Sequence, residues 1–191
     1  MIEQLLRLLA DTFPSVDPSQ VPSILAALRR RGYNSSWLWG QDSDPDPWQG
    51  DVVDPVTIYS TDDSGAPTKW TGPALLLSNT CDFQESGTVL AAACLPAADI
   101  CQEATLVEPI THNQIAHLMY LEEVPQLGSR VVDLSMVQTL SASYLRSALG
   151  DQRCVRRGRF AQLGYFVFLA KLTVHLLRPE TNEVSRADLP T

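Results

Sequence analysis

The sequence predicts an α+β fold in which helical segments flank a strand-rich middle. Near both ends of the chain, apolar residues recur at the spacing of a helix, whereas the middle holds short runs rich in Val, Ile and Thr. An acidic segment punctuated by proline, Gln41–Gln49, separates the first helical part from these runs and is typical of a linker. The 191 residues, 45% of them hydrophobic, are enough for one core with an attached helical segment.

Two helices are predicted before the linker. In Ile2–Thr12 the apolar side chains fall on one face of a short amphipathic helix. The second helix is expected after Asp17, a helix-capping residue followed by proline, and is expected to end at Gly32. Three arginines stand just before that glycine, where cations meet the negative end of the helix dipole.

Several strands are predicted after the linker. The first, Val52–Tyr59, alternates in polarity and is followed by Asp62-Asp63-Ser64-Gly65, a turn sequence. Further runs of strand length are Ala74–Leu77, Val89–Cys94, Ala116–Glu122 and Arg130–Leu134. The segment Val137–Leu149 is expected to hold a last strand and then a helix that begins near Ser141 or Ser143.

The run Phe160–Leu177 predicts a long apolar C-terminal helix. Its polar positions fall on one narrow stripe, so the helix should be buried on most sides by the strands, by the N-terminal helices or by a second subunit. Gln162, Lys171 and His175 argue against a membrane span. A possible homodimer follows from the same apolar surface.

The charge balance is acidic, with a formal net charge of −8 at pH 7 and a pI near 4.7. Proteins that neutralise many phosphates carry a basic surface, so RNA as a partner is disfavoured. Glu3 stands where a secretory signal would begin with basic residues, and a cytoplasmic location is therefore expected. No residue pattern calls for a cofactor.

Four segments in the middle of the chain together resemble the PemK/MazF toxins, compact SH3-like barrels that cut single-stranded RNA. These segments are Gly50–Val53, Gly72–Asn79, Val89–Pro96 and Val131–Leu145. The resemblance implies an SH3-like small β-barrel with added helices. The expected organisation is an N-terminal helical segment (1–40), a linker (41–49), the barrel (50–150), a C-terminal helix packed on it (151–178) and a polar tail (179–191).

The residues that those toxins use for cleavage are missing from the matching positions. The toxins place Arg before the proline of one strand, where this chain has Thr71-Gly72. They place Thr or Ser after the proline of the next strand, where Ala97 and Ala98 stand here. Cleavage through a 2′-hydroxyl needs groups that move a proton and stabilise an oxyanion.

The resemblance and these departures predict a non-catalytic MazF-like interaction or regulatory module in a bacterial toxin–antitoxin, stress or phage-defence system. Its partner would be a protein, such as a regulator, an antitoxin or a sigma-type factor. Two alternatives stay open. One is an endoribonuclease with relocated catalytic groups, and the other is a hydrolase or transferase that depends on Cys81.

The polar cluster after Leu77 is the first candidate for chemistry. Cys81 could act as a nucleophile with His112 or His117 as base and Asp82 as its orienting group. In the structural alternative, Asp82 and Asn79 cap backbone N–H groups and Cys81 is buried. The same Cys, Asp and His residues lack a diagnostic ligand spacing, so no metal site is expected. All four cysteines are expected to be reduced and mostly buried.

The second candidate is a basic and aromatic surface. Arg153, Arg156, Arg157 and Arg159 form a concentrated basic group that could bind a phosphate or an acidic partner, or could be a solvated lead-in to the last helix. Four tryptophans could be interface anchors or could pack the N-terminal helices onto the barrel. They are Trp37, Trp39, Trp48 and Trp70.

Overall fold

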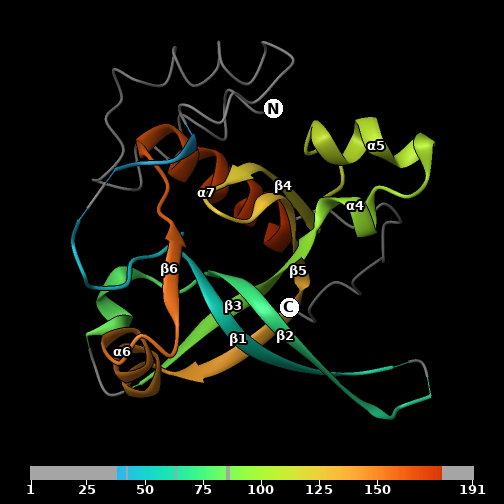
Figure 1. Cartoon of the computed structure of the whole chain (residues 1–191). Helices are drawn as coiled ribbons and strands as arrows, with labels where there is room; N and C mark the ends of the chain where they lie inside the picture. The colour runs from blue at the N-terminus through green and yellow to red at the C-terminus, as the bar shows by residue number, and fades with distance from the viewer. Residues whose placement is uncertain (1–37, 42, 63, 85–86, 178–191) are drawn as a thin grey trace, which may run out of the picture.

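The computed structural model describes residues 38–41, 43–62, 64–84 and 87–177, so the two predicted N-terminal helices lie outside the described residues. Six antiparallel strands form one sheet in the order β4-β5-β3-β2-β1-β6 (Figure 1). Their bounds are β1 Val52–Thr61, β2 Pro67–Leu76, β3 Thr88–Pro96, β4 Leu118–Val124, β5 Gly128–Ser141 and β6 Val155–Gly158. Four helices accompany them in the described part, namely α4 Ala97–Ile100, α5 Ala104–Thr111, α6 Ala142–Gly150 and α7 Gln162–Leu177, and a 3-10 turn, η2, spans Thr80–Phe83.

The predicted α+β class is confirmed, but the sheet does not close into a barrel. Its outer strands, β4 and β6, are not paired with each other. The sheet curves until β1 approaches β5, where the Tyr59 backbone N–H donates to Oε1 of Gln138 at 3.2 Å. That contact runs through a side chain and replaces the backbone ladder that a closed barrel would need.

The central strand β3 is buried on both faces, and this divides the interior into two cores. Val89, Ala91 and Ala93 face one core, which α6 covers. Ala92 and Cys94 face the other, which α7 covers. We call these the α6 core and the α7 core. Small side chains suit β3 because helices or curved neighbouring strands pack closely on each side of it.

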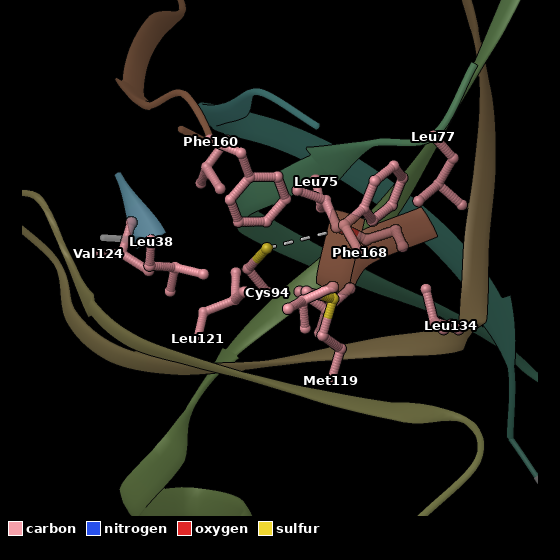
Figure 2. Packing of buried hydrophobic residues seen from close by; sticks show 14 of the residues in the cluster. Leu38, Leu75, Leu77, Cys94, Met119, Leu121, Val124, Leu134, Phe160 and Phe168 are labelled. Atoms are coloured by element: carbon pink, nitrogen blue, oxygen red, sulfur yellow. Dashed lines mark hydrogen bonds between the residues drawn. The ribbon is translucent and has the colours of Figure 1, made fainter. Parts of the chain in front are cut away.

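The α7 core joins residues of β1 to β5 to the C-terminal helix. Figure 2 shows the rings of Phe160 and Phe168 beside Leu75 of β2, Cys94 of β3 and Met119 of β4. The ring centroids of the two phenylalanines are 5.8 Å apart. Large aromatic side chains of this kind carry much of the apolar area that a small core buries.

The helix α7 differs from the long apolar helix that was expected. It has 16 residues, and its middle, Phe166–Leu169, is buried on every side of the helix. Further along, Val174 is 41% exposed and Leu176 is 69% exposed. Burial is therefore complete in the middle of the helix, whereas side chains near its C-terminal end are exposed. A Cβ added to Gly164 would lie 2.4 Å from the Leu38 carbonyl oxygen, so glycine permits the chain before the sheet to cross the helix here.

Side chains cover backbone groups along the β4 edge of the sheet. At the β4 edge, Oδ1 of Asn113 accepts a hydrogen bond from the Tyr120 backbone N–H at 2.7 Å, and its Nδ2 donates to the Tyr120 carbonyl at 3.4 Å. The indole N–H of Trp39 donates to the Glu122 carbonyl at 2.9 Å. Exposed strand edges pair readily with other chains, and these contacts occupy the β4 edge.

No helix in the described ranges is long and apolar enough to cross a membrane.

Candidate partner-binding pocket

A small pocket opens between the start of β1 and the helix α6, and we call it the α6 pocket. Its volume is about 160 Å³. Five of the nine lining residues carry apolar side chains, which we call the floor, and the other four bring polar atoms, with Arg153 as the charged member. The lining residues are Pro55, Val56, Thr57, Leu140, Tyr144, Leu145, Ala148, Arg153 and Cys154.

The helix α6 positions one wall of this pocket. Ser141 caps the helix, because its Oγ accepts a hydrogen bond from the Tyr144 backbone N–H at 3.3 Å. Leu145 and Ala148, one turn apart, then point into the α6 core and are each 2% exposed. Tyr144, one turn before Ala148 on the same side of the helix, is 58% exposed, which places an aromatic ring at the pocket rim.

Arg153 lies at this rim with its charge accessible. Its Nη2 is 3.2 Å from Oδ2 of Asp151 and 3.1 Å from Oγ of Ser147. The guanidinium carbon lies 5.5 Å from the centre of the Tyr144 ring. Both members of the ion pair are more than half exposed, at 51% and 62%, and exposed pairs of this kind contribute little to stability. The pair can therefore be exchanged for another carboxylate at low cost.

Cys154 lines the pocket but is not prepared as a nucleophile. Its backbone N–H donates to the Ala148 carbonyl at 2.9 Å, which fixes the thiol at the pocket wall. The residue is 3% exposed, and burial raises the pKa of its thiol to about 11. At neutral pH the sulfur therefore keeps its proton, whereas cysteine nucleophiles react as thiolates.

The other three arginines of the predicted basic group bind acidic and carbonyl groups of the same chain. Arg159 makes a two-point contact with Asp51, with Nε–Oδ1 at 2.8 Å and Nη2–Oδ2 at 2.9 Å. Arg159 is 5% exposed and Asp51 is fully buried. The indole of Trp48 covers the guanidinium at 4.1 Å, and this stacking completes a buried cation site.

Arg156 and Arg157 extend this internal network. Arg156 Nη1 donates to the Asp44 carbonyl and lies 3.8 Å from Oδ2 of Asp51. Arg157 Nε is 3.1 Å from Oδ2 of Asp54, and its Nη1 donates to Gln126. The predicted linker is thus attached to β6 through side chains, and three of the four arginines serve the fold. Of this group, Arg153 is the member placed at a pocket.

The described tryptophans pack within the chain. The ring of Trp39 stacks on Phe160 with centroids 5.1 Å apart, and Trp70 is half-buried against the α6 core. Trp48 remains 38% exposed on its outer side. Trp37 lies outside the described residues. Trp39 and Trp70 thus pack on Phe160 and on the α6 core, and the predicted packing of the N-terminal helices lies outside the described residues.

The structure brings together only part of the predicted cysteine site. Cys81 Sγ lies 3.9 Å from Oδ1 of Asp82 in η2. His112 ends α5 and pairs with Glu108 at 3.8 Å. In Figure 1 the green turn η2 beside α6 and the helix α5 are at opposite sides of the molecule. A histidine at the position of His112 cannot act as base for Cys81 in this arrangement.

The structural alternative for this cluster also needs correction. Cys81 is exposed, whereas it was expected to be buried. Asn79 precedes η2 without a side-chain capping bond, and the turn is closed instead by the Asp82 backbone N–H donating to the Asn79 carbonyl. Ser78 supplies the side-chain contact, since its Oγ accepts from the Leu90 backbone N–H at 2.9 Å.

All four cysteines are free thiols, and two of them, Cys94 and Cys154, are buried. Among the described residues, no group of three or more His, Cys, Asp or Glu side chains is close enough to hold a metal ion. The pocket itself was not predicted from the sequence. Tyr144 and Arg153 are nine positions apart, and only the turn after α6 brings them together.

No protein-family model matches the chain, and no curated protein matches it.

Proposed function

We propose that this protein is a non-catalytic, MazF-like interaction module that binds a protein partner through the α6 pocket. The observation that carries the proposal is the make-up of the pocket, which has an apolar floor, an exposed Tyr144 and an exposed, exchangeable Arg153. Exposed aromatic and arginine side chains around an apolar depression are the composition of interface hot spots. The bacterial toxin–antitoxin, stress or defence setting rests on the sequence resemblance alone.

The chemistry of the described residues supports binding over catalysis. Cys154 keeps its proton at neutral pH, since burial raises the pKa of the thiol to about 11. Thr71 donates to or accepts from the Thr57 hydroxyl at 3.1 Å on β2, and Ala97 opens α4, so neither position supplies the toxin's charged or hydroxyl group. A relocated endoribonuclease site would need several free cations, whereas Arg156, Arg157 and Arg159 bind groups of the chain itself.

The experiment compares partners recovered on the tagged full chain with those recovered on two variants. Arg153→Glu with Tyr144→Ala changes the pocket rim, and Arg146→Glu changes an arginine on the same helix that hydrogen-bonds the Gln84 carbonyl outside the pocket. A partner that is lost with the first variant, kept with the second and rebound when both proteins are purified supports the proposal.

A cleavage assay tests whether the protein lacks ribonuclease activity, as the proposal requires. Purified protein is incubated with single-stranded RNA at low salt, where phosphate contacts are strongest. No cleavage is expected. Cleavage that disappears on substitution of Arg153 or Cys81 would overturn the interaction-only function.

A further inference from the structure

The volume of the α6 pocket limits what can enter it. Pockets for drug-sized ligands and cofactors are roughly 300–1,000 Å³. At about 160 Å³, the α6 pocket is well below that range. An apolar cavity of about 150 Å³ holds one benzene molecule. One phenyl ring or one branched aliphatic group therefore fits here, and a nucleotide does not.

The floor determines the chemistry of the group that enters. Pro55, Val56, Leu140, Leu145 and Ala148 provide apolar contact. Of the polar groups beside the floor, the hydroxyl of Thr57 pairs with that of Thr71, and the buried Cys154 thiol is a weak hydrogen-bonding group. An apolar side chain gives up no hydrogen bonds when it enters such a site. A polar side chain would lose its hydrogen bonds to water without gaining new ones.

Arg153 and Tyr144 at the rim determine which partner group can lie beside the apolar side chain in the pocket. Within the described part of the chain, Arg153 makes its side-chain hydrogen bonds through Nη2 alone, to Asp151 and Ser147. A carboxylate that displaces Asp151 can meet Nη2 together with the neighbouring Nε–H, as Asp51 does with Arg159. A guanidinium presents paired donors that match a carboxylate in a two-point contact. Among the residues that the structure describes, Asp151 is the acid paired with Arg153, and the Tyr144 ring lies over one face of the guanidinium.

The sheet edge restricts the mode of docking. Asn113 and Trp39 occupy backbone groups along the outer edge of β4, so a partner strand meets capped positions there. Insertion of a side chain into the α6 pocket needs no free edge, because its contacts come from side chains of β1, β5 and α6.

From these observations we infer that the α6 pocket binds a partner segment in which a large apolar residue is followed directly by an acidic one. The apolar side chain fills the pocket, and the carboxylate binds Arg153 in place of Asp151. This inference rests on the proposed function and adds to it the chemistry of the partner.

The probe is a fluorescein-labelled peptide, Ser-Gly-Phe-Asp-Gly-Ser, with an amidated C-terminus, titrated into the full chain and followed by fluorescence anisotropy. Saturable binding is expected, with Kd on the order of 1 mM or tighter, as for a single anchored side chain. Amide NMR signals of Leu145 and Ala148 should shift during the titration. Absence of saturable binding and of these shifts would overturn the inference.

Two matched peptides and two variants separate the parts of the inference. The Phe-Asn peptide and the Arg153→Gln variant should each weaken binding about tenfold, which is the loss expected for a charge-assisted hydrogen bond. Combining the two should cause little further loss. The Ala-Asp peptide should not bind measurably, and Arg146→Gln should bind like the unaltered protein. Equal binding of the Ala-Asp peptide, or an unchanged Kd for Arg153→Gln, contradicts the inference.

Failure here is distinguishable from failure of the proposed function. If the peptides do not bind while the rim variant still loses its protein partner, the partner chemistry is wrong and the interaction function stands. If the Phe-Asp peptide binds at Arg153 but no partner depends on the rim, the inferred chemistry stands and the interaction function fails.

Discussion

The buried pair between Arg159 and Asp51 shows how single residues hold the segment before the sheet in place. Asp51 is inaccessible to solvent, and its Oδ2 also accepts a hydrogen bond from the Trp48 backbone N–H at 2.9 Å. Arg159 Nη2 donates to the Asp46 carbonyl as well. Buried ion pairs are weak sources of net stability when complete, but they are costly to break.

Replacing Asp51 with Asn should therefore destabilise the protein strongly. The buried guanidinium of Arg159 would lose the charge of the carboxylate that it contacts at two points, and losses of about 3–5 kcal/mol are typical when one partner of a buried pair is removed. Urea unfolding measures the free energy of unfolding. The control is Asp151→Asn, which breaks an exposed Asp–Arg pair and should change stability by less than about 1 kcal/mol. Equal effects of the two substitutions would contradict this account.

Lys171 is a buried cation with a different environment. It is 7% exposed, and its Nζ donates to the carbonyls of Asn113 and Ile115, which joins α7 to the loop before β4. Burial lowers the pKa of this lysine from 10.5 to about 8. Between those pH values the unfolded chain binds more protons than the folded one, so deprotonation favours the folded state.

The difference in unfolding free energy between the wild type and Lys171→Met should therefore depend on pH. Methionine has similar length and no titrating group. As the pH rises from 8 to 10, the wild type should gain unfolding free energy relative to the variant. Urea unfolding at several pH values measures that difference. The buried thiols of Cys94 and Cys154 contribute equally to both proteins, so their effect on the pH dependence drops out of the difference. A difference that is flat or falls with pH would show that Lys171 keeps an ordinary pKa in the fold.

At the scale of elements, the side-chain cap on β4 has a measurable role. Asn113 has φ +55°, a left-handed conformation that asparagine and glycine accept most readily. Asn113→Gly keeps this conformation and removes the amide that pairs with Tyr120. A loss of about 1–2 kcal/mol is expected, since a backbone donor and acceptor lose their partners.

The same variant should also self-associate more readily, because the β4 edge is then open to another chain. Sedimentation velocity at rising concentration measures this. Asn113→Asp is the matched control, because its carboxylate still accepts from the Tyr120 N–H and only the contact to the carbonyl is lost. If the Gly variant stays as monodisperse as the wild type, the cap does not protect the edge.

The elements that the sequence predicted best are those with strong local signals. Val52–Tyr59 lies within β1, the turn after it is closed by Asp62, and the helix begins after the cap Ser141. Most of Phe160–Leu177 is helical. In each case alternation, turn chemistry or a capping residue acts over a few positions, so neighbours in sequence are sufficient to specify it.

The elements that were missed depend on distant contacts. β6 has the sequence Val-Arg-Arg-Gly, which lacks strand character, and its arginines are held by Asp51 and Asp54 a hundred residues earlier. The start of β2 is polar and exposed, and pairing with β1 supports it. In α5 the interior Pro109 hides the helical pattern, while Ile110 packs on β4 and β5.

The candidate site was predicted only in part for the same reason. Arg153 was singled out as a member of a basic group, and the structure separates it from the three arginines that bind acidic or carbonyl groups. Nothing in the sequence indicated which of the four would face a pocket, because the decision depends on the positions of Asp51, Asp54 and Asp44. Tyr144 had no functional signal at all.

At the scale of the whole molecule, the two cores share β3 and should unfold together. Phe168 belongs to the α7 core and Leu145 to the α6 core, and each is at most 2% exposed. Replacing either with Ala should cost about 2–5 kcal/mol. Far-UV circular dichroism and tryptophan fluorescence should report one coincident transition for both variants. Two separate transitions in either variant would show that the cores are independent units.

The run of alanines in β3 also has an evolutionary consequence. Ala91, Ala92 and Ala93 are each 0% exposed and point alternately to opposite cores, so a larger residue at any of them meets packed atoms. Substitutions at these positions should be confined to the smallest side chains. The exposed residues at the end of β1 and the start of β2 can change freely. Distant descendants of the same ancestor should therefore be easier to recognise by three consecutive tiny residues in a middle strand than by any charged or aromatic motif.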